Sequence, residues 1–186
     1  MNKHSAEQFT HAAQNVGATV LPLPDMDAAV SYIKQHVDGP VLLPPSPSLA
    51  RTSIAAALKD SGLSVIEEDF RSHGANANAG ITSANFAFAD TGTLVLESTE
   101  EAVRIATTLP EKHFVILDPA KILPCADEAA PLLQQLHHNM PQLYLAYITG
   151  PSRTADIERV LTIGVHGPAQ LHILLLEGLS DDPLER

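Results

Sequence analysis

The sequence predicts an α/β fold in which helices cover a mostly parallel sheet. Short apolar segments alternate with amphipathic ones along the first half of the chain, which is the pattern of repeated strand–helix–strand units. The 186 residues fit one domain whose hydrophobic core needs neither disulfides nor a structural metal. Hydrophobic residues make up 45% of the chain and its 14 prolines are scattered, so no segment resembles a disordered tract. We therefore expect residues 1–186 to form a single globular domain.

The first half of the chain is expected to alternate helices and strands. Helices are predicted over residues 5–16, 25–37 and 48–59, and strands over residues 18–23, 40–45 and 63–68. The first helix lies within residues 1–17, and Asp25 is placed to cap the second because its carboxylate can accept N–H groups of the first turn. Residues 70–80 contain two glycines and two asparagines, which are typical of a surface loop.

The second half is less regular. Residues 81–89 are ambiguous between a short helix and an extended stretch. Strands are predicted over residues 93–97, 113–118, 143–148, 161–165 and 171–176. Helices are predicted over residues 99–108, with Thr99 as the N-cap, and over residues 126–139, whose apolar side chains share one face. Residues 179–186 are expected to form an acidic tail.

Charge and composition exclude several classes of function. The chain has 22 acidic and 11 basic residues and a net charge of -11, so neither nucleic acid nor an anionic membrane surface is expected as a partner. The apolar runs are shorter than the ~20 residues of a membrane-spanning helix and the N-terminus lacks a signal pattern, which predicts a cytoplasmic protein. Cys125 is the single cysteine, whereas an iron–sulfur cluster normally takes about four. We interpret Cys125 as a small buried hydrophobe, with a thiol activated at a helix start as the alternative.

The densest polar motif is Ile148-Thr-Gly-Pro-Ser-Arg-Thr-Ala-Asp-Ile-Glu158. We expect a strand to end at Gly150-Pro151 and a short helix to open with Ser152. The start of such a helix offers an anion its unpaired N–H groups, the nearby hydroxyls and the bidentate guanidinium of Arg153. Open α/β sheets also bind their ligands at the carboxyl ends of their strands. The alternative is a capped helix with a solvated Arg153. The candidate ligand-binding residues of this motif are Gly150, Ser152, Arg153, Thr154 and Asp156.

A second motif, Ala87-Phe-Ala-Asp-Thr-Gly-Thr-Leu-Val95, is a turn of small residues that leads into a strand. Gly92 permits close approach of a ligand or of another backbone, and Thr91 and Thr93 add hydroxyls. Asp90 is a candidate general base or a ligand for hydroxyl groups. The alternative is a turn that satisfies its own backbone, and the nearby Asn85 fits either a ligand-facing or a structural role.

His166 is the third candidate, in Ile163-Gly-Val-His-Gly-Pro168. A histidine held between two glycines at a strand end can act as an acid, a base or an orienting donor. The sequence has no HxxxH or HxH spacing, so no metal site is expected. It also lacks the GxSxG, Walker A, GxGxxG and CxxC patterns, which removes the usual support for serine hydrolase, P-loop and dinucleotide-binding functions.

Three motifs, taken in chain order, resemble the lactate utilization protein C family, the LUD-domain proteins. They are Ala89-Asp-Thr-Gly-Thr-Leu-Val95, the 148–158 motif, and Gly164-Val-His-Gly-Pro168 with the apolar strand that follows it. The resemblance implies a Rossmann-like three-layer α/β sandwich related to the sugar-phosphate isomerase and CoA-transferase group. It also implies a bacterial cytoplasmic protein that acts with two iron–sulfur partner subunits in the oxidation of L-lactate to pyruvate. No cofactor is then expected in this chain itself.

Competing functions remain open at this point. The preferred one is a non-redox subunit that binds a small anion, such as lactate, between the Asp90 and Ser152 turns, with Asp90 and His166 as catalytic residues. Its further ligand-binding residues are Asn85, Thr91, Gly92 and Thr93. The rival is a stand-alone isomerase or CoA-transferase-like enzyme that acts on a phosphorylated or CoA-linked substrate, with Asp90 or Glu97 as base or nucleophile. A scaffold with a vestigial pocket is the third.

Overall fold

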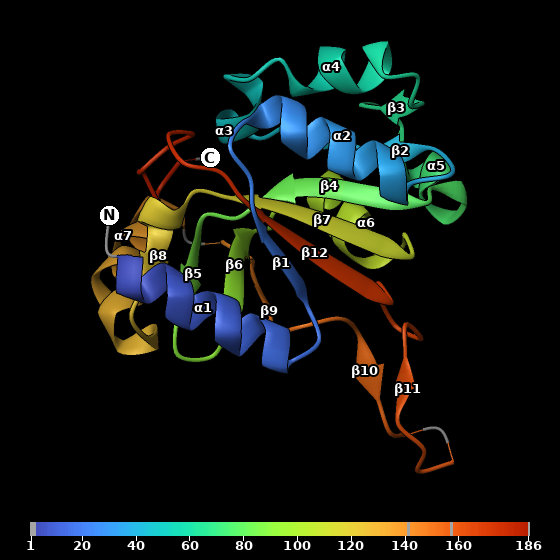
Figure 1. Ribbon diagram of the computed structural model, residues 1–186. Coiled ribbons are helices and arrows are strands. Elements are labelled where there is room, and N and C mark those ends of the chain that lie inside the picture. Colours follow the sequence, from blue (N-terminus) through green and yellow to red (C-terminus); the bar gives the residue numbers. More distant parts are fainter. Residues whose placement is uncertain (1–2, 141, 157, 186) are drawn as a thin grey trace.

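The centre of the molecule is a six-stranded parallel sheet, seen in the computed structural model, which describes residues 3–140, 142–156 and 158–185 (Figure 1). Residue 157 of the polar motif and residue 186 of the expected tail lie outside this description. In spatial order the strands are β1 (Thr19–Pro22), β12 (Gln170–Leu175), β7 (Lys112–Leu117), β4 (Ala79–Ser83), β2 (Val41–Leu42) and β3 (Val65–Ile66). Every neighbouring pair in the sheet is parallel. The predicted α/β fold with a mostly parallel sheet is confirmed.

Helices α2 (Met26–His36) and α4 (Ile54–Asp60) cover one face of this sheet. Asp25 caps α2 as predicted, because its Oδ1 accepts the Ala28 N–H at 2.8 Å. Ile33 and Leu58 are fully buried against the side chains of β4, β7 and β12 that point to this face. Such packing is expected when the apolar face of an amphipathic helix covers a buried parallel sheet.

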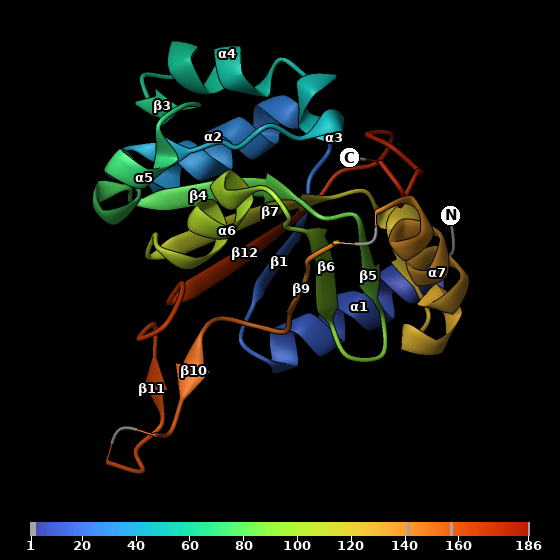
Figure 2. The ribbon, with the colours of Figure 1, turned by 180° about the vertical axis from the view of Figure 1, so that it is seen from behind.

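The opposite face carries α1 (Lys3–Asn15) and α6 (Glu101–Thr108), and Figure 2 shows α6 in front of β4 and β7. Gly80 on β4 explains how closely α6 can approach. A Cβ at Gly80 would lie 1.9 Å from the Ala106 carbonyl oxygen of α6, a distance that no side chain tolerates. The glycine therefore brings the helix into direct contact with the sheet.

A second sheet lies beside α1 on the same face, and the sequence did not predict it. Its strands are β8 (Ile122–Leu123), β5 (Phe86–Phe88), β6 (Thr93–Glu97) and β9 (Leu145–Ile148). The ambiguous segment 81–89 is therefore extended, divided between the end of β4 and β5. Leu94 and Leu96 of β6 pack with Val115 and Ile173 of the central sheet, and α7 (Ala130–Asn139) covers the outer side.

Several local predictions are wrong. The expected loop at 70–80 contains α5 (Phe70–His73), the short helix η1 (Gly74–Asn76) and the start of β4. The helix expected over 48–59 is two helices, α3 (Pro47–Ala50) and α4. Thr99 does not cap α6, because Glu100 is at that position and the Thr99 hydroxyl instead accepts the Tyr144 N–H at 3.1 Å.

The short helix expected to open with Ser152 is absent from the described residues of that motif. Residues Arg153–Thr154 form β10, which pairs antiparallel with β11 (Thr162–Ile163) in a hairpin that projects from the body (Figures 1 and 2). Glu158 and Arg159 have φ values of 54° and 57°, so the chain turns back there instead of continuing as a helix. Two short helices complete the fold, η2 (Pro119–Lys121) and η3 (Ala126–Ala129). Within the described part of the chain, no helix is long and apolar enough to span a membrane.

Candidate functional site

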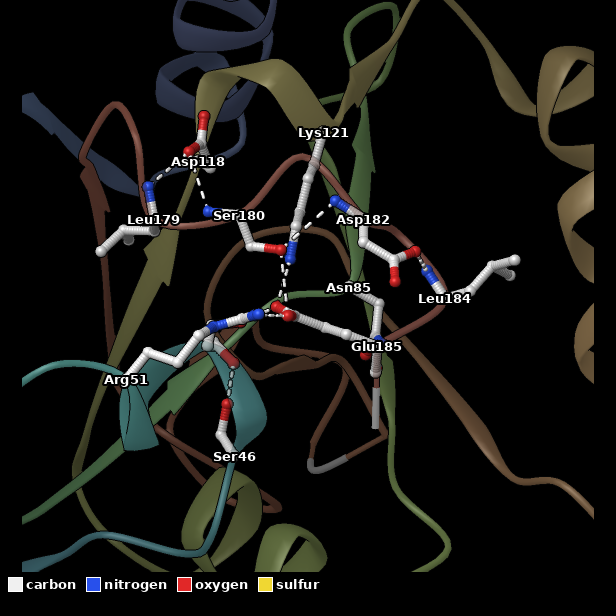
Figure 3. Close-up of polar contacts among 12 residues, drawn as sticks. Ser46, Arg51, Asn85, Asp118, Lys121, Leu179, Ser180, Asp182, Leu184 and Glu185 are labelled. Atoms are coloured by element: carbon white, nitrogen blue, oxygen red, sulfur yellow. Dashed lines mark hydrogen bonds and ion pairs between the residues drawn. The ribbon is translucent and has the colours of Figure 1, made fainter.

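The carboxyl edge of the central sheet is crossed by residues 177–185, which follow β12 (Figure 3). Asp118, directly after β7, holds this segment. Its Oδ2 accepts the Leu179 N–H at 2.8 Å and the Ser180 N–H at 3.2 Å, while Oδ1 accepts the Ala120 N–H at 2.9 Å. One buried carboxylate thus links the edge of the sheet to two backbone amides of the segment.

The carboxylate of Glu185 lies at the centre of a group of donors on this edge (Figure 3). Lys121 Nζ donates to Glu185 Oε1 at 2.6 Å, and the guanidinium of Arg51 pairs with Oε2. The Ser48 hydroxyl donates to Oε1, and the Ser180 hydroxyl donates to Oε2 at 3.0 Å. We call Ser48, Arg51 and Lys121 the edge cluster, because these three residues contact Glu185 from the body of the domain.

Burial makes the edge cluster electrostatically unusual. The Lys121 side chain is 2% exposed and that of Glu185 is 8% exposed, whereas Arg51 is 57% exposed. Burial lowers the pKa of Lys121 to about 8, although the negative charge of Asp118 opposes this shift. A buried ammonium is costly unless it is paired, so this position needs an anion beside it. In this structure the anion is Glu185.

The parallel topology explains why these residues meet. Ser48 lies on α3 after β2, Asn85 follows β4, and Lys121 lies on η2 after β7. Because parallel strands end at the same edge, the residues that follow them converge there, and open α/β sheets bind their ligands at such edges. Sequence inspection missed Ser48, Arg51, Lys121 and Glu185. The available signal was a lysine in Asp118-Pro-Ala-Lys121, directly after a buried strand.

A cavity of about 400 Å³ opens beside the edge cluster, lined in part by Ser46, Ser83, Asn85, Glu97 and Glu185. The amide of Asn85 donates to the Glu185 main-chain oxygen at 2.8 Å, and its oxygen accepts the Glu97 N–H at 2.8 Å. The hydroxyls of Ser46 and Ser83 are hydrogen-bonded to each other. Asn85, proposed from the sequence, therefore lies at the carboxyl edge.

The Asp90 turn lies elsewhere, between β5 and β6, and packs on α1. Gly92 has a φ of +67°, and a Cβ there would be 2.3 Å from the Ala13 nitrogen of α1. The Thr93 hydroxyl contacts those of Thr91 at 2.7 Å and Thr149 at 2.9 Å. Asp90 itself is exposed. Of the two close approaches that Gly92 permits, a ligand or another backbone, the structure shows the backbone of α1.

The Gly150–Thr154 segment also packs on the end of α1. A Cβ at Gly150 would be 2.4 Å from the Val16 carbonyl oxygen, and the Arg153 guanidinium donates to that same oxygen. Val16 follows α1 and precedes β1, so this contact is at the amino edge of the central sheet. The turn follows the carboxyl end of a strand, as expected, but that strand is β9 of the second sheet, so the turn does not lie at the carboxyl edge of the central parallel sheet.

The structure brings Ser152 and His166 together. Both line a cavity of about 210 Å³ at the amino edge, together with the buried His113 and with Thr107 and Thr108. Burial lowers the pKa of His113 to about 3. Asp90 is not among the residues that line this cavity, and Thr154 and Asp156 lie on the hairpin, where the Asp156 N–H donates to the Thr154 hydroxyl at 3.2 Å. The predicted site residues thus do not form one site: Asn85 lies at the carboxyl edge, Ser152 and His166 lie at the amino edge, and Asp90 lies on the β5–β6 turn.

Two further sequence expectations concern metals and the thiol. Among the described residues, no group of three or more His, Cys, Asp or Glu side chains is arranged to hold a metal ion. Cys125 is partly exposed rather than fully buried, and it precedes η3.

Comparison with known proteins places this architecture in a family. Residues 6–176 match the LUD domain. Lactate utilization protein C of Bacillus subtilis strain 168 is 32% identical over 163 residues, which span 81% of this chain and 68% of that protein. The protein of the same name from Bacillus velezensis is 31% identical over 81% of this chain and 67% of its own length. A crystal structure of a DUF162 family protein from Deinococcus radiodurans has the same fold, with a TM-score of 0.65, 16% identity and coverage of 92% of this chain and 96% of that one. The chain belongs to the LUD domain family.

Proposed function

We propose that this protein is a non-redox component of a lactate utilisation system and that it binds a small carboxylate at the edge cluster. The observation that carries the proposal is the Glu185 carboxylate, which is held there by Lys121, Arg51 and Ser48. The names of the relatives from Bacillus support the lactate context. The proposed location is the cytoplasm.

The chemistry of the cluster suits a 2-hydroxy acid. An ammonium, a guanidinium and a hydroxyl supply charge-assisted hydrogen bonds to a carboxylate. The adjoining cavity of about 400 Å³ presents the hydroxyls of Ser46 and Ser83 and the amide of Asn85, which can bond a hydroxyl next to that carboxylate. A small hydroxy acid can therefore satisfy both the charged and the neutral donors of the edge.

In this proposal, partner subunits accept the electrons that are released when lactate is oxidised. The chain has one cysteine, Cys125, and one thiolate cannot ligate an iron–sulfur cluster, which normally takes about four. The role left to this chain is to bind and orient the acid. Iron–sulfur proteins that co-purify with it from cells grown on lactate would support this division of roles.

Calorimetric titration with L-lactate tests the binding step. The unaltered protein should bind lactate, and Lys121→Met and Arg51→Gln should each weaken binding by at least about tenfold, the equivalent of 1.4 kcal/mol. Glu128→Gln, at an exposed position of η3, is the control and should bind like the unaltered protein. If Lys121→Met binds lactate normally while Arg153→Ala, Asp90→Ala or His166→Ala loses it, the ligand lies at the amino edge or at the Asp90 turn.

Glu97 favours one alternative function. It lines the same cavity, half-buried, and its Oε1 accepts the Thr99 N–H at 2.7 Å. An enzyme of the CoA-transferase type would use such a carboxylate as a nucleophile toward an acyl-CoA. Mass spectrometry after incubation with acyl-CoA distinguishes the two functions. A CoA adduct on Glu97 would favour the transferase, and an unmodified protein that binds lactate would favour the binding subunit.

A further inference from the structure

Residues 177–185 are attached to the domain by polar contacts and by the partly buried side chains of Leu179 and Leu184, which pack against the hydrophobic core. They form no helix or strand, and among the residues that the structure describes, their backbone N–H bonds to the body of the domain are the two that Asp118 accepts from Leu179 and Ser180. Glu177, Gly178, Asp181 and Asp182 are exposed. Segments with few buried apolar contacts and few backbone bonds open locally at low free-energy cost. With two partly buried leucines and two backbone bonds to the body, residues 177–185 are held by fewer contacts than the strands of the central sheet, and we expect them to open at a lower free-energy cost.

Hollows lie on both sides of the segment. The cavity of about 400 Å³ is bounded by Glu185, and a cleft of about 550 Å³ on the other side is lined by Arg51, Asp118 and residues 177–182. Arg51 reaches Glu185 from the second hollow, and Ser48 reaches it from the first. The segment thus borders two hollows at the carboxyl edge, one lined by Ser48 and the other by Arg51.

The edge cluster and the Glu185 carboxylate that it binds also come from different parts of the chain. Ser48, Arg51 and Lys121 all lie within residues 6–176, which match the LUD domain, whereas Glu185 lies outside that range. The cations therefore belong to the domain itself, and the carboxylate that they bind comes from a following segment.

We propose that residues 177–185 are a displaceable strap, in which the Glu185 carboxylate occupies the ligand position of the edge cluster and competes with a small carboxylate such as lactate. This inference rests on the proposed function. Ligand binding would release Glu185 to solvent and join the two hollows. Because the ligand carboxylate would take the position between Lys121 and Ser48 that Glu185 now occupies, strap and ligand exclude each other.

The expected effect follows from the fraction of molecules with the strap open. When only about 1–10% of molecules have the competent conformation, the apparent dissociation constant is raised about 10- to 100-fold. Glu185→Gln removes the charge while it keeps the side-chain shape, so it should tighten lactate binding by about that factor. Ser180→Ala removes a single hydroxyl donor to Glu185 and should give a smaller gain.

The test combines calorimetry with hydrogen exchange on the full chain. L-lactate should bind Glu185→Gln about 10- to 100-fold more tightly than the unaltered protein or the control Glu128→Gln. In the unaltered protein, saturating lactate should speed exchange at the Leu179 and Ser180 amides, and in Glu185→Gln exchange should be fast without lactate. Circular dichroism would confirm that each variant is folded.

The two proposals fail in different ways. If Glu185→Gln binds lactate no more tightly than the unaltered protein while Lys121→Met still abolishes binding, the strap is refuted and the lactate site stands. If neither the unaltered protein nor Glu185→Gln binds lactate, the proposed function is refuted, and the competitor role with it. Protection of the Leu179 and Ser180 amides by lactate would also overturn the strap, because the segment would then close over the ligand.

Discussion

Replacement of Gly92 by alanine tests whether the Asp-Thr-Gly-Thr motif serves to dock α1. In the structure a Cβ at this position would lie 2.3 Å from the Ala13 nitrogen, 2.5 Å from the Ala13 Cα and 2.7 Å from the Ala12 carbonyl carbon. All three are backbone atoms of α1, so no rotation of a side chain can relieve the contact. The helix must move away from the β5–β6 turn.

The magnitude follows from two contributions. Left-handed backbone, here a φ of +67°, costs an alanine about 1–2 kcal/mol, and overpacking a well-packed contact costs about 1–3 kcal/mol. Gly92→Ala should therefore lower the free energy of unfolding by about 2–5 kcal/mol. Because Phe9 and Ala13 of α1 are fully buried in the core, the helix cannot shift without the loss of that packing.

Gly62→Ala provides the matched control. Gly62 also has a positive φ, +91°, but no atom lies within 4 Å of the position of its added Cβ. It should show only the backbone cost of about 1–2 kcal/mol. Urea denaturation of both variants, with midpoints and m-values compared, separates the two effects. Equal stability of Gly92→Ala and Gly62→Ala would refute the docking of α1 on this turn.

Three further outcomes are expected. Arg153→Ala removes an exposed donor from the Val16 carbonyl oxygen, so urea denaturation should show a loss of about 1 kcal/mol or less, and a loss above 3 would contradict this role. Burial lowers the pKa of His113 to about 3 and that of His172 to about 4, so the unfolded chain binds protons below pH 6.5 that the native state does not. The free energy of unfolding should fall by about 2 kcal/mol per histidine between pH 7 and 5, and His172→Asn should lose half of this dependence; an unchanged slope would contradict the assignment. Because burial lowers the pKa of Lys121 to about 8, lactate affinity in Glu185→Gln, measured by calorimetry, should decrease as the pH rises through about 8, and a flat profile would exclude Lys121 as the ligand's cation.

The central sheet could be predicted because its signals are local. Residues 114–117 and 173–176 are continuous apolar runs, as expected for strands buried on both faces, and they lie in or next to β7 and β12. The periodicity of α2 and its Asp25 cap are equally local. The second sheet could not be inferred, because nothing in the apolar run 143–148 distinguishes a strand of one sheet from a strand of another.

The hairpin at 153–163 shows how a local signal can mislead. Ser152, Thr154 and the following acidic residues resemble a helix start, yet the pairing of Arg153 with Ile163 and of Thr154 with Thr162 decides the structure. That pairing joins residues eight and ten positions apart across the turn at Glu158 and Arg159, and the helix-start pattern of residues 152–158 does not indicate it.

The candidate site could be predicted from the sequence only in part. Asn85 lies at the carboxyl edge and Ser152 and His166 line one cavity, while their roles in binding stay predictions. The edge cluster was missed because Glu185 is 64 residues from Lys121 and 137 from Ser48 in the chain. Only the crossing of residues 177–185 over the sheet brings these groups together. The glycines of the two motifs were recognised as sites of close approach, but the approaching group is α1.

A crystal structure of the protein with L-lactate bound tests the carboxyl-edge site most directly. The lactate carboxylate should lie within hydrogen-bond distance of Lys121 Nζ and the Ser48 hydroxyl, with Glu185 withdrawn from both. Lactate in the cavity lined by Ser152 and His166, with the Lys121–Glu185 pair intact, would contradict the account.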